Sequence, residues 1–211
     1  MKITIVAGGT PPSKELMWDS IKDSKYTIAA DRGAEALIIN GFRPDYILGD
    51  FDSLKGEFLD ILSNDHINIV KYDSVKDFTD TEAAFNLALD LGADEIVLLG
   101  CTGSRIDHLF PNIGLLKRAL HKKVSCRIAD DCNVITLTDS PMTIKGSPGQ
   151  IISFFAYEEK VENFNIYGAK YELFNHTLIP FDGLTVSNEF LDKDIKITFH
   201  RGLVLIFFSR D

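Results

Sequence analysis

Aspartates follow several short apolar runs of this 211-residue sequence at the points where the runs end. Asp31 follows Tyr26–Ala30, while Asp50 and Asp52 follow Tyr46–Leu48. Neighbouring carboxylates repel one another unless a counter-charge is present. Mg²⁺ supplies one through oxygen ligands, and it usually bridges carboxylates to substrate phosphates. The pattern therefore predicts metal-assisted chemistry on a phosphate-bearing substrate. Further acidic residues near predicted strands are Asp45, Asp73, Asp77, Asp80 and Asp107.

The spacing of Asp50 and Asp52 suits a single ion. Residues two apart in an extended segment point to the same side, so both carboxylates can reach one metal. Gly49 directly before the pair and the other acids at strand ends favour this interpretation. The alternative is a solvated acidic turn, which is the more frequent explanation of an isolated Asp-x-Asp pattern.

The segment Gly100–His108 lies between a buried strand and a helix in the predicted order. Glycines let backbone N–H groups approach phosphate oxygens, and a helix N-terminus favours anions. Arg105 can pair with a phosphate through two hydrogen bonds. Asp107 can bind a metal, a substrate hydroxyl or Arg105. The alternative is a plain strand-to-helix turn in which Asp107 caps the helix.

Two other segments contain candidate phosphate contacts. Gly8–Lys14 resembles a phosphate-binding P-loop but lacks its Gly-Lys-Ser/Thr ending, and two prolines remove N–H donors. It is therefore not a P-loop, although it can line a nucleotide crevice. In Lys76–Asp80, Lys76 can neutralise a phosphate, while Asp80 or Thr79 can cap the following helix. The alternative is a cap surrounded by solvated charges.

Apolar strands alternate with amphipathic helices up to about Asp130. This order predicts a parallel, Rossmann-like sheet with helices on both faces. Loops at the carboxyl ends of such strands converge, so the acidic residues are expected to share one crevice. The expected strands are 3–7, 26–30, 46–48, 67–72, 96–99 and 124–129, and the expected helices are a first one containing Trp18, then 34–40, one around 58–62, 81–91 and 109–120.

After Pro141 the pattern changes to short alternating runs that predict an all-β sandwich or barrel. Proline and glycine cluster at 137–148, which places the boundary there. We therefore expect an α/β domain over residues 1–137 and an all-β domain over residues 138–211. The expected strands of the second domain are 150–157, 161–167, 170–174, 184–186, 195–200 and 203–209.

Composition narrows the class of protein further. The net charge is −9, which argues against a nucleic-acid binder held by broad phosphate contacts. No run of about 18 apolar residues occurs, so no membrane span is expected. Three cysteines without a CxxC pair indicate reduced thiols and a cytoplasmic protein.

Taken together and in order, these segments resemble the thiamine pyrophosphokinase family. The resemblance extends over essentially the whole chain, including the change from α/β to all-β. The matching segments are Gly8-Gly9 with Pro11-Pro12, Ala30–Ala34, Pro44-Asp45, Gly49–Ser53, Lys76–Glu82, Thr102–His108, Gly168–Leu173, Gly183–Glu189 and Gly202. Two positions depart from the family pattern: Ser104 replaces a glycine, and Pro111 stands where a helix former is usual.

The resemblance implies that the first domain binds ATP and Mg²⁺. The second domain would help to form a homodimer, with thiamine between the subunits. The metal ligands it implies are Asp50, Asp52 and Asp80, and these would act in catalysis together with Arg105 and Asp107. The ATP-binding residues it implies are Gly9, Asp31, Arg32, Lys76, Asp77, Thr102, Gly103, Arg105 and Asp107. Ser187 and Asn188 would lie near the thiamine pyrimidine.

The implied reaction transfers the pyrophosphoryl group of ATP to the thiamine hydroxyl, giving thiamine diphosphate and AMP. Asp107 is a candidate base for the hydroxyl proton. One alternative is another Mg²⁺-dependent phosphoryl or nucleotidyl transferase with a different alcohol acceptor. The other is a non-catalytic sensor of nucleotide or thiamine diphosphate, against which the retained Asp50, Asp52 and Asp80 weigh.

Overall fold

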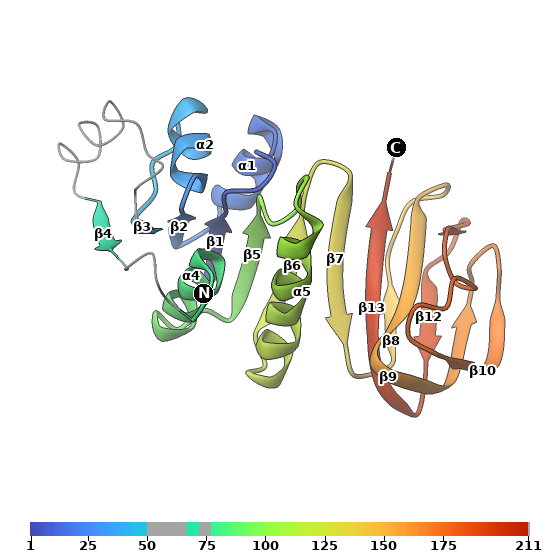
Figure 1. Cartoon of the computed structure of the whole chain (residues 1–211). Helices are drawn as coiled ribbons and strands as arrows, with labels where there is room; N and C mark the ends of the chain where they lie inside the picture. The colour runs from blue at the N-terminus through green and yellow to red at the C-terminus, as the bar shows by residue number, and fades with distance from the viewer. Residues whose placement is uncertain (50–66, 72–76, 211) are drawn as a thin grey trace. The chain divides into compact units, whose positions relative to one another are not determined.

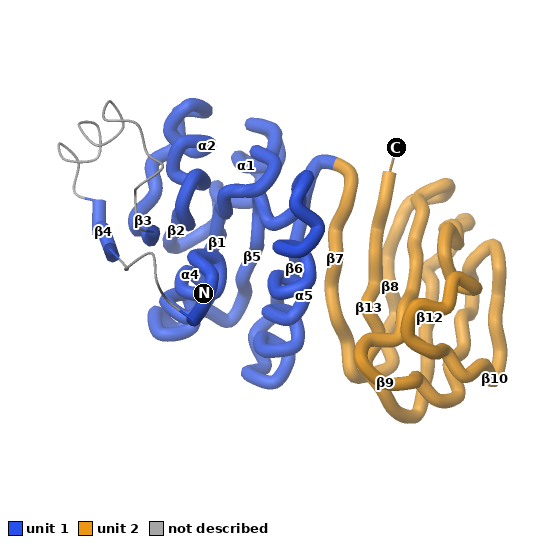
Figure 2. Tube along the Cα trace, in the orientation of Figure 1, with its two compact units in different colours: residues 1–131 blue, residues 132–211 orange. Residues whose placement is uncertain are grey.

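The computed structural model describes residues 1–49, 67–71 and 77–210 (Figure 1). The chain divides into two compact units, residues 1–131 and 132–211 (Figure 2). The division lies earlier than the boundary expected between residues 137 and 138. The reason is that β7, Asn133–Thr138, pairs antiparallel with β13 of the second unit, so its residues belong to that unit.

The first unit is an open parallel sheet with the strand order β4-β3-β2-β1-β5-β6. Its strands are β1 (Lys2–Val6), β2 (Tyr26–Ala30), β3 (Tyr46–Gly49), β4 (Asn68–Lys71), β5 (Glu95–Leu99) and β6 (Ser125–Ala129). Its helices are α1 (Lys14–Ile21), α2 (Gly33–Ile39), α4 (Asp80–Asp90) and α5 (Ile106–His121). The predicted α/β fold is confirmed, while the expected helix at 58–62 lies outside the described residues.

The direction of the chain across this sheet reverses between β1 and β5. From β1 the chain moves through β2 and β3 to β4, and it then returns to place β5 on the other side of β1. Because parallel crossovers are right-handed, this reversal puts α1 and α2 on one face and α4 and α5 on the other (Figure 1). Loops separate at such a switch point and leave a crevice there.

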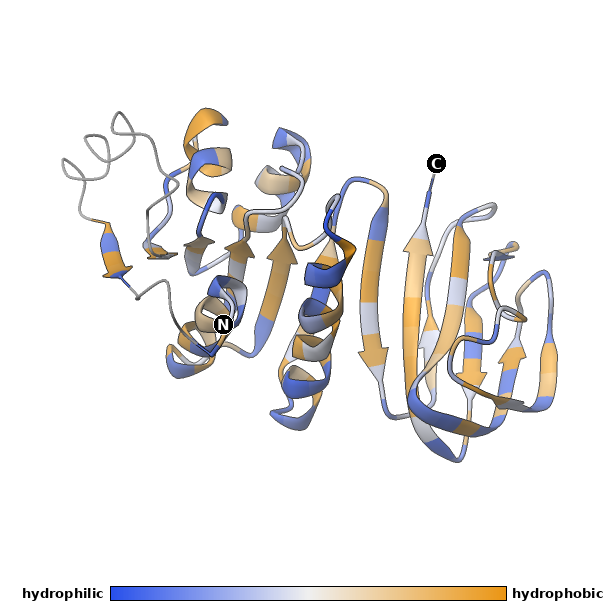
Figure 3. Cartoon of the chain, in the orientation of Figure 1, coloured by the Kyte–Doolittle hydropathy of each residue, from blue (hydrophilic) through white to orange (hydrophobic). Residues whose placement is uncertain are grey.

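Burial explains why these strands and helices form. The central strands β1, β2 and β5 are buried along most of their length because helices cover both faces, whereas the edge strand β4 is mostly exposed. Figure 3 shows the apolar residues of these strands in orange. Helix α4 turns its small residues and Phe85, which is fully buried, toward the sheet. Side chains cap the first turns of α1 and α4: the Ser13 side chain accepts from the Leu16 N–H, and the Thr79 side chain accepts from the Glu82 N–H.

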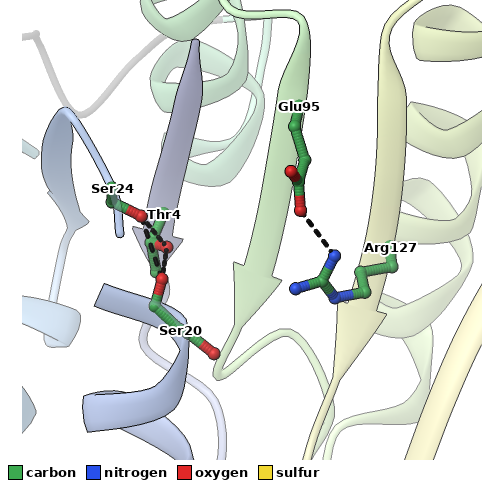
Figure 4. A network of polar contacts seen from close by, with 5 residues as sticks. All are labelled: Thr4, Ser20, Ser24, Glu95 and Arg127. Atoms are coloured by element: carbon green, nitrogen blue, oxygen red, sulfur yellow. Dashed lines mark hydrogen bonds and ion pairs between the residues drawn. The ribbon is translucent and has the colours of Figure 1, made fainter. Parts of the chain in front are cut away.

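Polar side chains also tie neighbouring elements of the first unit together (Figure 4). Thr4 is fully buried in β1, and its hydroxyl donates to the Ser20 carbonyl at the end of α1, 2.9 Å away. Ser24 donates to the same carbonyl at 2.9 Å. Arg127 of β6 pairs with Glu95 of β5 at 2.7 Å. These contacts satisfy groups that would otherwise be costly to bury.

The second unit is all-β and antiparallel, as predicted. Its strands are β7 (Asn133–Thr138), β8 (Met142–Ile144), β9 (Ile151–Tyr167), β10 (Leu173–Leu178), β11 (Asn188–Glu189), β12 (Ile195–Thr198) and β13 (Arg201–Ser209). β13 lies between β7 and β9, while β12 lies between β9 and β8. Buried aromatic and aliphatic side chains, Phe154 and Phe164 among them, fill the space between the strands.

Strand β9 is the main difference from the sequence expectation. Two strands were expected at 150–157 and 161–167, but the structure has one strand, Ile151–Tyr167. It continues through left-handed residues at Glu158 (φ 64°) and Asn163 (φ 53°). Its first half pairs with β13 and β11, and its second half pairs with β12 and β10. The strand expected at 184–186 is a turn instead.

Within the described part of the chain, no helix is long and apolar enough to cross a membrane.

Two glycines give opposite predictions for substitution by alanine. A Cβ at Gly33 would overlap the carbonyl oxygen of Val6, because α2 begins directly against β1. We expect Gly33→Ala to destabilise the protein by about 1–3 kcal/mol or more. Gly114 in α5 has open space around it, so Gly114→Ala should stabilise the protein by about 0.5–1 kcal/mol. Urea unfolding of both variants measures the two effects, and an equally stable Gly33→Ala would contradict the packing described here.

Candidate functional site

A pocket of about 370 Å³ lies at the carboxyl ends of β1, β2 and β5, at the switch point of the sheet. Three loops and the beginnings of two helices form its wall. The lining residues are Ala7–Gly9 after β1, Ala30–Arg32 after β2, Thr79–Thr81 at the start of α4, Gly100–Arg105 after β5, and His108 and Asn112 of α5. A crevice is therefore present at these strand ends, with Asp31 and Asp80 on its wall. Asp45 does not share it, because it precedes β3 and accepts from the Thr27 N–H at the amino ends of the strands.

The loops that follow β1 and β5 are joined to each other by backbone hydrogen bonds. The N–H of Gly9 donates to the carbonyl of Gly100, and the N–H of Thr10 donates to that of Thr102, both at 2.8 Å. A Cβ at Gly9 would collide with the carbonyls of Gly100 and Thr102. Glycine at position 9 thus allows the two loops to meet, and no other residue type fits there without movement.

Asp31 lies at the end of β2 in a backbone conformation that few residues adopt. Its φ is 51°, in the left-handed region, which aspartate tolerates better than most side chains. Strained residues of this kind cluster at functional sites. Gly8 lies beside it, and a Cβ at Gly8 would stand 3.2 Å from Asp31 Oδ2. Asp31 and the neighbouring Arg32 both line the pocket.

Asp80 is the first residue of α4 and does not cap the helix itself. The cap is Thr79, whose side-chain oxygen accepts from the Glu82 N–H at 3.1 Å. This answers the question that the sequence left open between the two residues. Asp80 is half-buried and lines the pocket at the positive end of the helix dipole.

Arg105 and Asp107 form an exposed ion pair with two contacts. Arg105 Nη2 donates to Asp107 Oδ2 at 2.6 Å, and Nε donates to Oδ1 at 3.3 Å. The hydrogen bond from Arg105 lowers the pKa of Asp107, and the same bond raises the pKa of Arg105. Arg105 lines the pocket, whereas Asp107 is not among its lining residues. Asp107 does not cap α5, which has no side-chain capping bond and begins at Ile106.

The other predicted residues are not all part of this pocket. Gly9, Asp31, Arg32, Thr102, Gly103, Arg105 and Asp80 line it. Asp77 is exposed and is not among its lining residues. Asp50, Asp52 and Lys76 lie outside the described residues. Among the described residues no group of three acidic, histidine or cysteine side chains is arranged to hold a metal.

Ser187 and Asn188 belong to the second unit. Ser187 is exposed, has a left-handed φ of 56°, and its N–H donates to Ser153 Oγ at 3.0 Å. Asn188 is only 3% exposed. Its Nδ2 donates to the Tyr171 carbonyl at 2.7 Å, and its Oδ1 accepts from the Tyr171 N–H at 3.0 Å. The Asn188 amide therefore fixes the turn around Tyr171.

Sequence reasoning missed Asn112. This side chain is 5% exposed, lines the pocket, and donates from Nδ2 to the Cys101 carbonyl at 2.9 Å. The spacing along the helix could have pointed to Asn112, because it follows His108 by four residues and such residues share a face of a helix. Pro111, the residue before Asn112, also lies in α5. The helix begins at Ile106, so the proline is inside the helix rather than at its first position.

The parallel sheet, the joined glycine loops and the helix N-termini at its switch point define an α/β enzyme that binds phosphate-bearing substrates. Residues 17–128 match the family described as thiamin pyrophosphokinase, catalytic domain. Residues 132–204 match thiamin pyrophosphokinase, vitamin B1 binding domain. The chain therefore belongs to the thiamin pyrophosphokinase family.

Known proteins of this family are similar to the chain along its whole length. The thiamine pyrophosphokinase of Bacillus subtilis (strain 168) is 28% identical over 211 residues, covering 99% of each chain. Its crystal structure matches with a TM-score of 0.90 over the whole of both chains. The thiamin pyrophosphokinase of Geobacillus thermodenitrificans is 31% identical, with a TM-score of 0.86 over 100% of this chain and 98% of that one. The reaction of the family makes thiamine diphosphate and AMP from thiamine and ATP.

The ion pair at the pocket predicts an unusually acidic carboxyl group. The pKa of Asp107 should lie below its usual range in the wild-type protein, and Arg105→Gln should raise it because the charged donor is lost. Carboxyl carbon shifts followed by NMR from pH 2 to pH 7 measure both values. The exposed Arg201→Gln in the second unit is the matched control. An Asp107 pKa that Arg105→Gln leaves unchanged would contradict this pairing.

Proposed function

We propose that this chain catalyses pyrophosphoryl transfer from ATP to thiamine, with ATP bound in the pocket at the switch point. The observation that carries the proposal is the pair of joined glycine-rich loops beside two helix N-termini. Helices α4 and α5 both begin at this pocket, so their dipoles favour the negative charge of phosphates. Arg32 and Arg105 add two cationic side chains to the same wall.

We propose Mg²⁺ as the counter-ion of the phosphates, held by Asp50, Asp52 and Asp80. The donors that line the pocket suit this hard cation, because they are carboxylates of Asp31 and Asp80 and hydroxyls of threonine. When bound, Mg²⁺ would supply charge neutralisation for the reacting phosphates.

The side chains of this chain have distinct tasks in the proposed reaction. The thiamine hydroxyl oxygen forms a bond to the β-phosphorus of ATP, and the hydroxyl proton passes to solvent. The bond from that phosphorus to the oxygen it shares with the α-phosphate breaks, and AMP leaves with that oxygen. Arg105 stabilises negative charge on the transferred group. Asp107 holds the Arg105 guanidinium in position by its two contacts. Because both of its carboxylate oxygens accept from Arg105, we assign Asp107 this orienting task rather than that of a base for the hydroxyl proton.

Further contacts complete the proposed ATP site. Gly9, Thr102 and Gly103 present backbone to the phosphates, and Asp31 and Arg32 face the nucleotide. Lys76 and Asp77 precede α4 in the chain and would contact ATP from that side. Asp77 is exposed, which leaves its side chain accessible to a ligand.

We propose that thiamine binds to the second unit near Ser187 and the turn that Asn188 fixes. Ser187 is exposed, so its hydroxyl is available to a ligand. Both ends of the Asn188 amide are hydrogen-bonded to the backbone of Tyr171, so its task is to hold that exposed aromatic residue in place. An aromatic face suits the cationic thiazolium ring of thiamine.

We also propose a homodimer formed through the second unit, in the cytoplasm. Large apolar side chains are exposed there, and such patches mark interaction surfaces. They include Tyr171, Phe174, Phe181, Leu184 and Val186, of which Phe181 is 90% exposed.

The first test is incubation of the protein with ATP, Mg²⁺ and thiamine, followed by phosphorus NMR. We expect thiamine diphosphate and AMP to appear together and to be lost with EDTA. ADP with thiamine monophosphate would mean transfer of a single phosphoryl group and would contradict the proposal. Turnover only with another alcohol would identify a different acceptor. Binding of thiamine without any product would indicate a sensor.

Asp80→Asn tests whether Asp80 belongs to the proposed site. We expect turnover to fall by about 100-fold or more, because a metal ligand is lost. The fold should persist, since Thr79 rather than Asp80 caps α4. Asp90→Asn at the other end of the same helix is the matched control, and its turnover and stability should stay near those of the wild type. Equal activity of Asp80→Asn and Asp90→Asn would remove Asp80 from the proposed site.

The dimer is tested by light scattering after size exclusion. We expect the mass of two chains for the wild type and a smaller mass for Phe181→Asp, since a charge there would oppose burial of the patch. The substitution lies on an exposed side chain, so the fold should not change. A wild type with the mass of one chain would contradict the homodimer.

A further inference from the structure

Asn112 occupies a place in the pocket that the reaction described above does not use. It lies in the second turn of α5 and is 5% exposed, although asparagine is mostly found at protein surfaces. Its Nδ2 donates to the Cys101 carbonyl at 2.9 Å, so α5 contacts the loop that precedes it. Buried polar side chains are costly unless they are hydrogen-bonded, and this bond satisfies two such groups at once.

The bond completes a series along the β5–α5 loop. The carbonyls of Gly100 and Thr102 accept from backbone N–H groups of the β1–α1 loop, each at 2.8 Å. The Cys101 carbonyl between them accepts from Asn112 instead. Three consecutive carbonyl oxygens of this loop are therefore held by donors, and only the middle one depends on a side chain.

The orientation of these carbonyls decides what the loop can bind. A carbonyl oxygen carries partial negative charge, so one that turned into the pocket would repel phosphate oxygens. The peptide unit is planar and trans, so a fixed Cys101 carbonyl makes the Thr102 N–H point in the opposite direction.

We propose that Asn112 is a positioning residue that holds the Gly100–Gly103 loop in the conformation that accepts the phosphates of ATP. The proposal rests on the proposed function, since it takes ATP as the ligand of this pocket. Asn112 acts through the Cys101 peptide. Loss of the amide donor is thus expected to weaken ATP binding and to leave thiamine binding unaffected.

The test compares Asn112→Ala with the wild type by steady-state kinetics and by calorimetric titration with ATP alone. We expect the KM and Kd for ATP to rise by about tenfold, because a buried carbonyl loses its partner. The KM for thiamine should change by less than about twofold. Asn112→Leu keeps the size of the side chain and adds no charge but removes the donor, so it should behave in the same way and can replace Asn112→Ala if that variant does not fold.

Asn165→Ala is the matched control. Asn165 is 6% exposed in the second unit, and its Nδ2 donates to the Asn163 carbonyl at 2.7 Å. Its loss should lower the midpoint of thermal unfolding, Tm, without changing the KM for ATP. An unchanged KM and Kd for ATP in both Asn112 variants would overturn the proposal, and so would equal rises in the KM of ATP and thiamine. A wild type that binds ATP but makes no thiamine diphosphate would contradict the proposed reaction only.

Discussion

Backbone hydrogen bonds between the β1–α1 and β5–α5 loops are the constraint on which the pocket depends. They extend the pairing of two central parallel strands beyond the strand ends, from the Ala7 N–H donating to Leu99 to the Thr10 N–H donating to Thr102. Glycine at position 9 permits this approach. Because both loops lie at the reversal of the strand order, the same bonds that join them also shape the crevice between the diverging helices.

Much of the first unit could be predicted from the sequence because each of its strands and helices has a residue pattern that is visible within the segment itself. Strands buried on both faces are continuous apolar runs, and helices between them show their own periodicity. The acidic residues at strand ends predicted a shared crevice, and Asp31 and Asp80 do lie together on its wall. Whether Thr79 or Asp80 caps α4 depends on which of the two residues begins the helix, and a sequence pattern does not fix a helix boundary to one residue.

The remaining features depend on contacts between distant residues. The single strand β9 arises because its two halves find different partners, β13 and β12, late in the chain. The division between the units follows from the pairing of β7 with β13, so proline and glycine near residues 141–149 marked only a local turn. The carbonyl that Asn112 holds belongs to a loop whose course the sequence does not reveal.

The position of β13 has a consequence for the order of folding. β13 is the last strand of its unit to be synthesised, yet it lies in the interior of the sheet between β7 and β9. Until it emerges from the ribosome, β7 and the first half of β9 lack their shared neighbour and expose unpaired edges. Such edges are open to wrong pairing. Assembly of the second unit must therefore wait for its final residues, whereas the sheet of the first unit can form before them.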